Sequence, residues 1–253
     1  MKANWKLALM CAAAITFAFT SCDKKKDEPK PDQEQKDTDP QQDPEDEGSV
    51  ISVTDGTAAE WANLAAVSAT CPDDGLYLGL KSVKVYADEL YINVLVEYDP
   101  EEIPDRAWTP FHMYINVNNS DQTGGYGDQF LDANSDILLE GVVFADGEAC
   151  AYAPEVFAWI GEVGGTGWSW SDPLTAAGEF CTTQHLPGNL IEIQMLREII
   201  PLPAGVAWAD EFTIGFDIQQ NWDSVGILPL NSPDAEGSDA SGHANKLKVK
   251  INK

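Results

Sequence analysis

The stretch ELYINVLVEY at residues 89–98 decides the fold class, because apolar side chains occupy every second position. Leu90, Ile92, Val94 and Val96 fall on one face of an extended chain, which is typical of a strand with one buried face. The alternation recurs in FHMYINV at 111–117. The same alternation occurs in Ile137-Leu139-Val143, Ile191-Ile193-Met195, Phe212-Ile214-Phe216-Ile218 and Leu247-Val249-Ile251. In the last stretch Lys246, Lys248 and Lys250 occupy the alternate positions, and we expect them to face outward.

Turn residues separate these strands, as in Pro72-Asp73-Asp74-Gly75 and Asp146-Gly147. A helical pattern is restricted to Ala58–Ala66 and to one turn at Met195–Ile199. Ile51–Val53, in contrast, has the pattern of a short half-buried strand. Many half-buried strands in one domain need a second layer to cover them. The sequence therefore predicts an all-β fold, an antiparallel β-sandwich.

The N-terminus has the pattern of an export signal. Basic Lys2 and Lys6 precede an apolar run from Leu7 to Phe19, and Thr20-Ser21-Cys22 follows. The run is too short to span a bilayer, which takes about 20 apolar residues. The segment resembles a bacterial lipoprotein signal, although Phe19 stands where leucine is usual, and the resemblance implies cleavage before Cys22 and fatty acylation of that cysteine.

Residues 23–49 contain no aliphatic or aromatic side chain, so we expect a disordered tether. Its charged start resembles the export signal of Bacteroidetes surface lipoproteins, which implies an outer-membrane lipoprotein that is exposed at the cell surface. The predicted organisation is a signal peptide at 1–21, a lipidated cysteine and linker at 22–49, and one domain at 50–253.

The charge balance excludes one class of partner. The chain has 42 acidic and 15 basic residues, a net charge of −27, whereas nucleic acids and anionic lipid surfaces need clustered Lys and Arg. Neutral ligands, cations or proteins remain. Three cysteines follow Cys22, and the two that are nearest in sequence, Cys150 and Cys181, are the candidate pair for a disulfide. Spacing alone does not establish the pairing.

Four motifs, in order along the chain, resemble carbohydrate-binding modules of family 9 and the related DOMON-like domains. The resemblance implies a jelly-roll-like β-sandwich that binds sugars. The motifs are Asp55-Gly56 with Glu60-Trp61, the segment Asp88–Val94, the stretch MYINVNNSDQTGGYGDQFLDANSDILLEG at 113–141, and Phe212–Pro229 with Gly215, Trp222 and Gly226.

The same resemblance implies a structural calcium ion, although Asn116-Val117-Asn118 replaces a usual Asp-x-Asp. Calcium prefers several oxygen ligands, and the alternative is an ordinary polar turn. The candidate ligands are Asn116, Asn118, Asp121, Asp128 and Asp136, with Asn119 and Asp132 nearby.

No motif indicates catalysis, and we expect a protein that is not an enzyme. His112, His185 and His243 occur in unrelated contexts, GxSxG is absent, and no Cys/His spacing suggests zinc. His112 alternates with apolar Phe111 and Met113, which is typical of the outer face of a strand. A haem site is disfavoured because no Met/His ligand pair is evident.

Tryptophans are the candidate ligand-binding residues, because indole rings stack on the apolar faces of sugars. Trp159, Trp168 and Trp170 cluster in the glycine-rich segment WIGEVGGTGWSWSDP, and Trp108 is a further candidate. The alternative is burial in the core, which is usual for tryptophan and is the interpretation for Trp61, Trp208 and Trp222. Two functions stay open: a surface glycan-binding lipoprotein, and a structural or protein-interaction lipoprotein without a sugar ligand.

Overall fold

The computed structural model describes residues 50–126, 128–174, 180–235 and 240–253. The predicted signal peptide, Cys22 and the linker at 22–49 lie outside these residues. Within the described part no helix is long and apolar enough to cross a membrane. The described residues form strands and two short 3-10 helices, η1 (Ala59–Ala62) and η2 (Arg197–Ile199).

The strands are β1 (Val67–Thr70), β2 (Leu80–Asp88), β3 (Tyr91–Tyr98), β4 (Trp108–Asn116), β5 (Ile137–Ala145), β6 (Glu148–Ala149), β7 (Glu155–Ala158), β8 (Cys181–Leu186), β9 (Leu190–Leu196), β10 (Glu211–Gln220), β11 (Asp223–Leu228) and β12 (Leu247–Asn252). Six of the strands, β3, β4, β5, β9, β10 and β12, lie on the stretches that the sequence predicts. The predicted all-β fold is confirmed.

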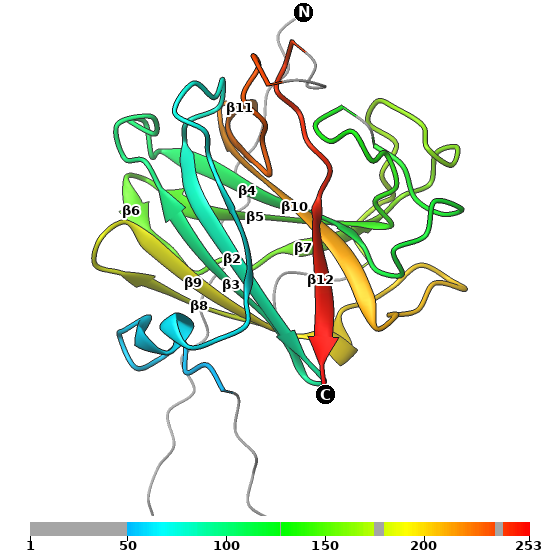
Figure 1. Cartoon of the computed structure of the whole chain (residues 1–253), viewed down its shortest axis with the longest axis horizontal. Helices are drawn as coiled ribbons and strands as arrows, with labels where there is room; N and C mark the ends of the chain where they lie inside the picture. The colour runs from blue at the N-terminus through cyan, green and yellow to red at the C-terminus, as the bar shows by residue number, and fades with distance from the viewer. Residues whose placement is uncertain (1–49, 127, 175–179, 236–239) are drawn as a thin grey trace, which may run out of the picture. The chain divides into compact units, whose positions relative to one another are not determined.

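The strand order is β6-β5-β4-β10-β12-β2-β3-β9-β8, with β1, β7 and β11 attached to β2, β5 and β10. The link at β12 joins what would otherwise be two sheets: β12 pairs with β10 along four residues and with β2 through Ile251 and Asn252 (Figure 1). The sandwich and its jelly-roll type therefore remain predictions, because the pairing is continuous.

The main core is one apolar cluster to which β2, β3 and β9 contribute together with β4, β5 and β10. Ile92, Val94 and Val96 of β3 are fully buried, as their alternation predicts. Leu90 is an exception, because it lies exposed in the β2–β3 turn, where Asp88 Oδ1 accepts hydrogen bonds from the backbone N–H groups of Leu90 and Tyr91.

The predicted strand at Ile51–Val53 is wrong. Both residues are buried, but they lie in a loop and pack with Trp61 and Leu95 in a separate apolar cluster. The backbone turns at this point, where the N–H of Asp55 donates to the carbonyl of Ser52. Two alternate apolar residues are therefore buried here within a loop.

A second apolar cluster covers the opposite face of β4, β5 and β10. Its buried members are Tyr114, Tyr126, Phe130, Leu138, Trp170 and Ile227. They come from β4, β5 and β11 and from two loops, residues 117–136 with 127 excepted and residues 159–174, which Figure 1 shows side by side. Both faces of β4 are thus buried, and the alternation in its sequence does not divide core from solvent.

Candidate functional site

Three charged residues form a row across the central strands, on the face opposite the main core. His112 of β4 lies directly opposite Glu140 of β5 on one side and Asp217 of β10 on the other. His112 is 1% exposed and Asp217 is fully buried. As predicted, the His112 side chain lies on the face of the sheet that points away from the main core. It is nevertheless not exposed to solvent, because the loops that carry the second apolar cluster fold over this face.

His112 bridges the two carboxylates. Its Nε2 lies 3.0 Å from Glu140 Oε2, and its Nδ1 lies 3.7 Å from Asp217 Oδ2 and 3.2 Å from the Tyr114 hydroxyl. Burial alone would lower the pKa of His112, but hydrogen bonds and charge attraction from Asp217 and Glu140 together outweigh it and raise the pKa to about 9. The imidazole is therefore positively charged at neutral pH.

Amide side chains extend this row. Gln129 and Gln219 both donate to Asp217 Oδ2, at 2.9 and 2.6 Å, and Gln129 also donates to Ser224 Oγ at 3.1 Å. Gln129 is 9% exposed, and its Oε1 has no hydrogen-bond partner within the described residues. A buried acceptor without a partner costs about 1–3 kcal/mol, so this oxygen is suited to a donor from outside the protein.

Two members of this row, His112 and Glu140, form the floor of a cavity of about 410 Å³, which we call the His112 cavity. Ligand sites typically have volumes of about 300–1,000 Å³. Trp168 and Trp222, which are 58% and 61% exposed, belong to its wall. The lining residues are His112, Tyr126, Gln129, Glu140, Trp168, Gln219, Trp222 and Ser224.

Trp222 lies at the tip of the β10–β11 hairpin in a conformation that disfavours tryptophan. Asn221 and Trp222 link the paired residues Gln220 and Asp223, and their φ angles are +50° and +71°. Two positive φ angles are the mark of a type I′ turn, in which Asn-Gly is the preferred sequence. A bulky residue in the left-handed region costs about 1–2 kcal/mol, so a large exposed ring is retained at an energetic cost. The interpretation of Trp222 as a core residue is wrong.

Trp168 is held by contacts between the two covering loops. Tyr126 N–H donates to the Gly165 carbonyl at 2.8 Å, and Gly167 N–H donates to Asp128 Oδ2 at 3.2 Å. The Trp168 ring meets the Tyr126 ring edge to face, with centroids 5.9 Å apart. Trp168 is thus positioned by its loop and remains accessible to a ligand.

The other two tryptophans of this segment are structural. Trp170 is 7% exposed and belongs to the second apolar cluster. Trp159 lies against Gly125 and Gly161, where an added Cβ would overlap its indole ring, and its Nε1 donates to the Glu162 carbonyl at 2.9 Å. The candidates of this segment therefore separate into one exposed ring, Trp168, and two packed ones.

Trp108, the fourth candidate, is 50% exposed at the start of β4. It lines a second cavity of about 210 Å³, which we call the Trp108 cavity. Glu140 and Trp222 line both cavities. Trp108 therefore lies in the same surface region as Trp168, although the sequence separates them by 60 positions.

The residues predicted to bind calcium take part in hydrogen bonds in and around the turn that follows β4. No cluster of three or more His, Cys, Asp or Glu side chains suited to a metal occurs among the described residues. Instead these side chains organise the turn: Asn116 Oδ1 and Asn118 Oδ1 accept from the Ser120 N–H, and Asp136 Oδ2 accepts from the Val117 N–H. Asp121 is exposed, and Asp128 binds the Gly167 N–H.

Lys246 supplies a cation beside this turn. Its ammonium donates to the Asp132 carbonyl and to Asn134 Oδ1, and it lies 3.1 Å from Asp132 Oδ2. Lys246 was expected to face outward, but it is buried. The reason is that these oxygen acceptors form a closed site for its ammonium group.

The predicted disulfide between Cys150 and Cys181 is absent, because both thiols are free. His185 Nε2 lies 3.0 Å from the Cys150 carbonyl, and Thr183 donates to the Tyr152 carbonyl, so Cys150 is level with the far end of β8. Cys181 is four residues away along that strand, about 13 Å. A disulfide needs Cα atoms within about 7 Å.

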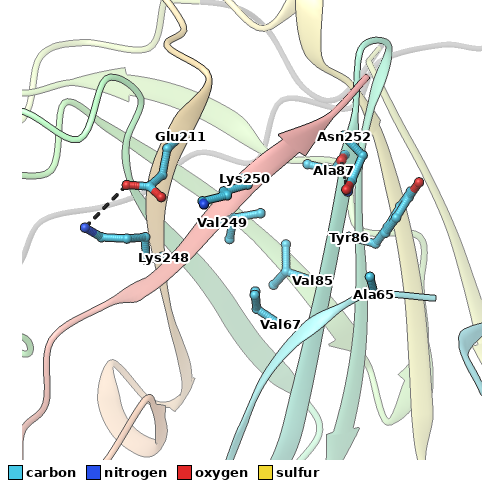
Figure 2. A pocket seen from close by; sticks show the side chains of 10 residues that line it. All are labelled: Ala65, Val67, Val85, Tyr86, Ala87, Glu211, Lys248, Val249, Lys250 and Asn252. Atoms are coloured by element: carbon cyan, nitrogen blue, oxygen red, sulfur yellow. Dashed lines mark hydrogen bonds and ion pairs between the residues drawn. The ribbon is translucent and has the colours of Figure 1, made fainter.

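Another cavity, of about 330 Å³, lies where β12 diverges from β2. Figure 2 shows Val67, Val85 and Val249 in this cavity, and Lys248 paired with Glu211 at 3.3 Å. This lysine and this glutamate bind each other, and the aromatic residue of the described lining, Tyr86, is only half-exposed. We therefore place the candidate site at the His112 and Trp108 cavities, whose tryptophans are exposed.

Sequence reasoning identified Trp168 and Trp108 but missed His112, Gln129, Gln219 and Trp222. The available signal for Trp222 was Asn221-Trp222 between two alternating strands, where Asn-Gly would be expected. No protein-family model and no curated protein matches this chain. The candidate function therefore depends on the geometry of the site.

Proposed function

We propose that this protein is a carbohydrate-binding lipoprotein without catalytic activity, which holds a neutral glycan at the outer surface of the outer membrane through a lipid anchor on Cys22. One observation carries the proposal: two exposed indole rings, Trp168 and Trp222, line a cavity with a polar floor. Aromatic rings bury the apolar C–H faces of sugars, while polar side chains bind the hydroxyl groups.

The polar floor suits hydroxyl donors. Gln129 lines the cavity, and its Oε1 is a buried acceptor without a hydrogen-bond partner within the described residues. Glu140 adds a carboxylate that lies at the cavity and is partly exposed. Because acceptors outnumber free donors at this floor, a ligand rich in hydroxyl groups fits better than one rich in carboxylates.

Binding is favoured over catalysis by the state of the charged row. His112 is held between Glu140 and Asp217, and its raised pKa keeps it protonated near neutral pH. A general base has to be unprotonated and free to accept a proton. The resemblance of the sequence to carbohydrate-binding modules of family 9 and DOMON-like domains is consistent with a binding role.

The test is a glycan array with the full chain, followed by titration calorimetry with the glycans that bind. We expect binding to neutral glycans, and a loss of about tenfold or more in affinity in Trp168→Ala and in Trp222→Ala. Such a loss corresponds to about 1.4 kcal/mol, within the range of a good aromatic contact.

Leu90→Ala is the matched control, because Leu90 is exposed but lies in the β2–β3 turn and lines neither cavity. It should bind like the unmodified protein. Absence of binding to every neutral glycan, or equal binding by all three variants, would contradict the proposed function.

A further inference from the structure

The His112 and Trp108 cavities adjoin, since Glu140 and Trp222 belong to the lining of both. The Trp108 cavity, with about 210 Å³, is smaller than a typical independent ligand site of about 300–1,000 Å³. Because it shares a wall with the larger His112 cavity, we treat the Trp108 cavity as an extension of that cavity. We call the two together the groove.

The groove follows two paired strands. Along β4, the residues His112, Pro110 and Trp108 alternate with core residues, and His112 lines the first cavity while Pro110 and Trp108 line the second. The β4–β5 register is shifted between Thr109 and Pro110, and such bulges redirect side chains. Four residues of strand span about 13 Å, so the groove is longer than a single stacking position.

The far half of the groove has its own aromatic ring and its own acceptors. Trp108 is half exposed there, and Glu155 of β7 lies directly opposite Glu140 of β5. Like charges directly opposite each other destabilise paired strands. A ligand that donates hydroxyl hydrogen bonds to both carboxylates relieves this repulsion, and no Lys or Arg of the described part of the chain lines this cavity.

We propose that the groove binds an oligosaccharide of at least two units, with one unit between Trp168 and Trp222 and the next stacked on Trp108. The carboxylates of Glu140 and Glu155 select a neutral sugar for the second unit and reject uronic acids. This inference rests on the proposed function and specifies the size and charge of its ligand.

The experiment is titration calorimetry of the full chain with cello-, xylo- and manno-oligosaccharides of one to four units, and with oligogalacturonides as acidic probes. For the series that binds, affinity should rise on going from one unit to two. Trp108→Ala should remove this rise, a loss of about two- to tenfold for the longer sugars, and leave binding of the single unit unchanged.

Trp168→Ala is the matched comparison, because it should weaken binding at every length. Glu155→Gln should increase binding of the oligogalacturonides relative to the neutral series. Affinity that does not depend on length, or a Trp108→Ala loss that is equal for one unit and for four, overturns the extended groove while the proposed function stands. Failure of every sugar to bind overturns both.

Discussion

His112 Nε2 lies 3.0 Å from Glu140 Oε2 in adjacent strands, and this contact makes the floor of the groove a charged site under a loop cover. On the other side of the ring, Asp217 is fully buried and lies 3.7 Å from Nδ1. The imidazolium therefore compensates a buried carboxylate that would otherwise destabilise the folded protein. This relationship determines how stability depends on pH.

The first prediction concerns the titration of His112. Its pKa is raised from 6.5 to about 9 in the folded protein, so its stabilising contribution is fully present below about pH 6.5 and is lost as the pH rises through 9. The shift corresponds to an order of 3 kcal/mol in the free energy of unfolding. NMR titration of the imidazole signals measures it, and His112→Gln assigns the signal by removing it.

His185 is the internal comparison, because burial lowers its pKa below 6.5. Its signal should titrate in the acidic range while that of His112 titrates near pH 9. A His112 signal that titrates at or below 6.5 would show that the imidazole is neutral in the groove.

The sequence predicts six strands, β3, β4, β5, β9, β10 and β12, because their apolar alternation is a local pattern. Phe212, Ile214, Phe216 and Ile218 of β10 are fully buried, as their alternation indicates. The groove depends on relations that no local pattern contains. Asp217 and His112 lie 105 positions apart and meet through strand pairing, and burial of His112 results from loops that fold over a second face of the sheet.

The tryptophans show the same limit. Trp168 and Trp170 have one residue between them and similar neighbours, yet one ring is exposed and the other is buried. Their difference depends on the contacts of Tyr126 and Gly165 in two separate loops. The exposure of Trp222 depends on the turn type, which the hairpin register sets.

The second prediction separates stability from binding at Trp222. Trp222→Gly removes the strain of a positive φ, about 1–2 kcal/mol, against a cost of about 0.5–1 kcal/mol for the greater freedom of glycine in the unfolded chain. The free energy of unfolding should stay level or rise by up to about 1.5 kcal/mol, measured by urea denaturation, while glycan affinity falls. A clear loss of stability would indicate that the ring packs in the fold.

The third prediction distinguishes Trp170 from Trp168. Trp170→Ala should lower the free energy of unfolding by about 3–5 kcal/mol, the usual cost of emptying a buried tryptophan site. Trp168→Ala should lower it by less than about 1 kcal/mol, because the ring is more than half exposed. Thermal or urea unfolding measures both variants. Equal losses would mean that Trp168 is a core residue and that the groove is misassigned.

The fourth prediction concerns the membrane anchor. The basic start, short apolar run and Thr20-Ser21-Cys22 ending predict lipidation at Cys22. Cys22→Ala should abolish metabolic labelling with a fatty acid and leave the precursor uncut on a gel. Replacement of Cys11, which lies within the apolar run, is the matched control and should leave labelling unchanged. Normal labelling of Cys22→Ala would reject the lipoprotein assignment.

The fifth prediction tests the ammonium of Lys246 as the cation beside the polar turn. Burial lowers the pKa of Lys246, and the negative charge of Asp132 opposes this effect. Lys246→Met leaves Asp132 and Asn134 without their donor, so the free energy of unfolding should fall by about 3 kcal/mol, the lower end for a broken buried pair because Asp132 is partly exposed. Lys248→Met removes the exposed pair with Glu211 and should cost at most about 1 kcal/mol.

The Lys246 ammonium group occupies the position beside Asp132 and Asn134 where a cation would bind. Millimolar calcium should therefore leave the melting temperature of the unmodified protein unchanged. A rise of several degrees would support the calcium site that the sequence suggests.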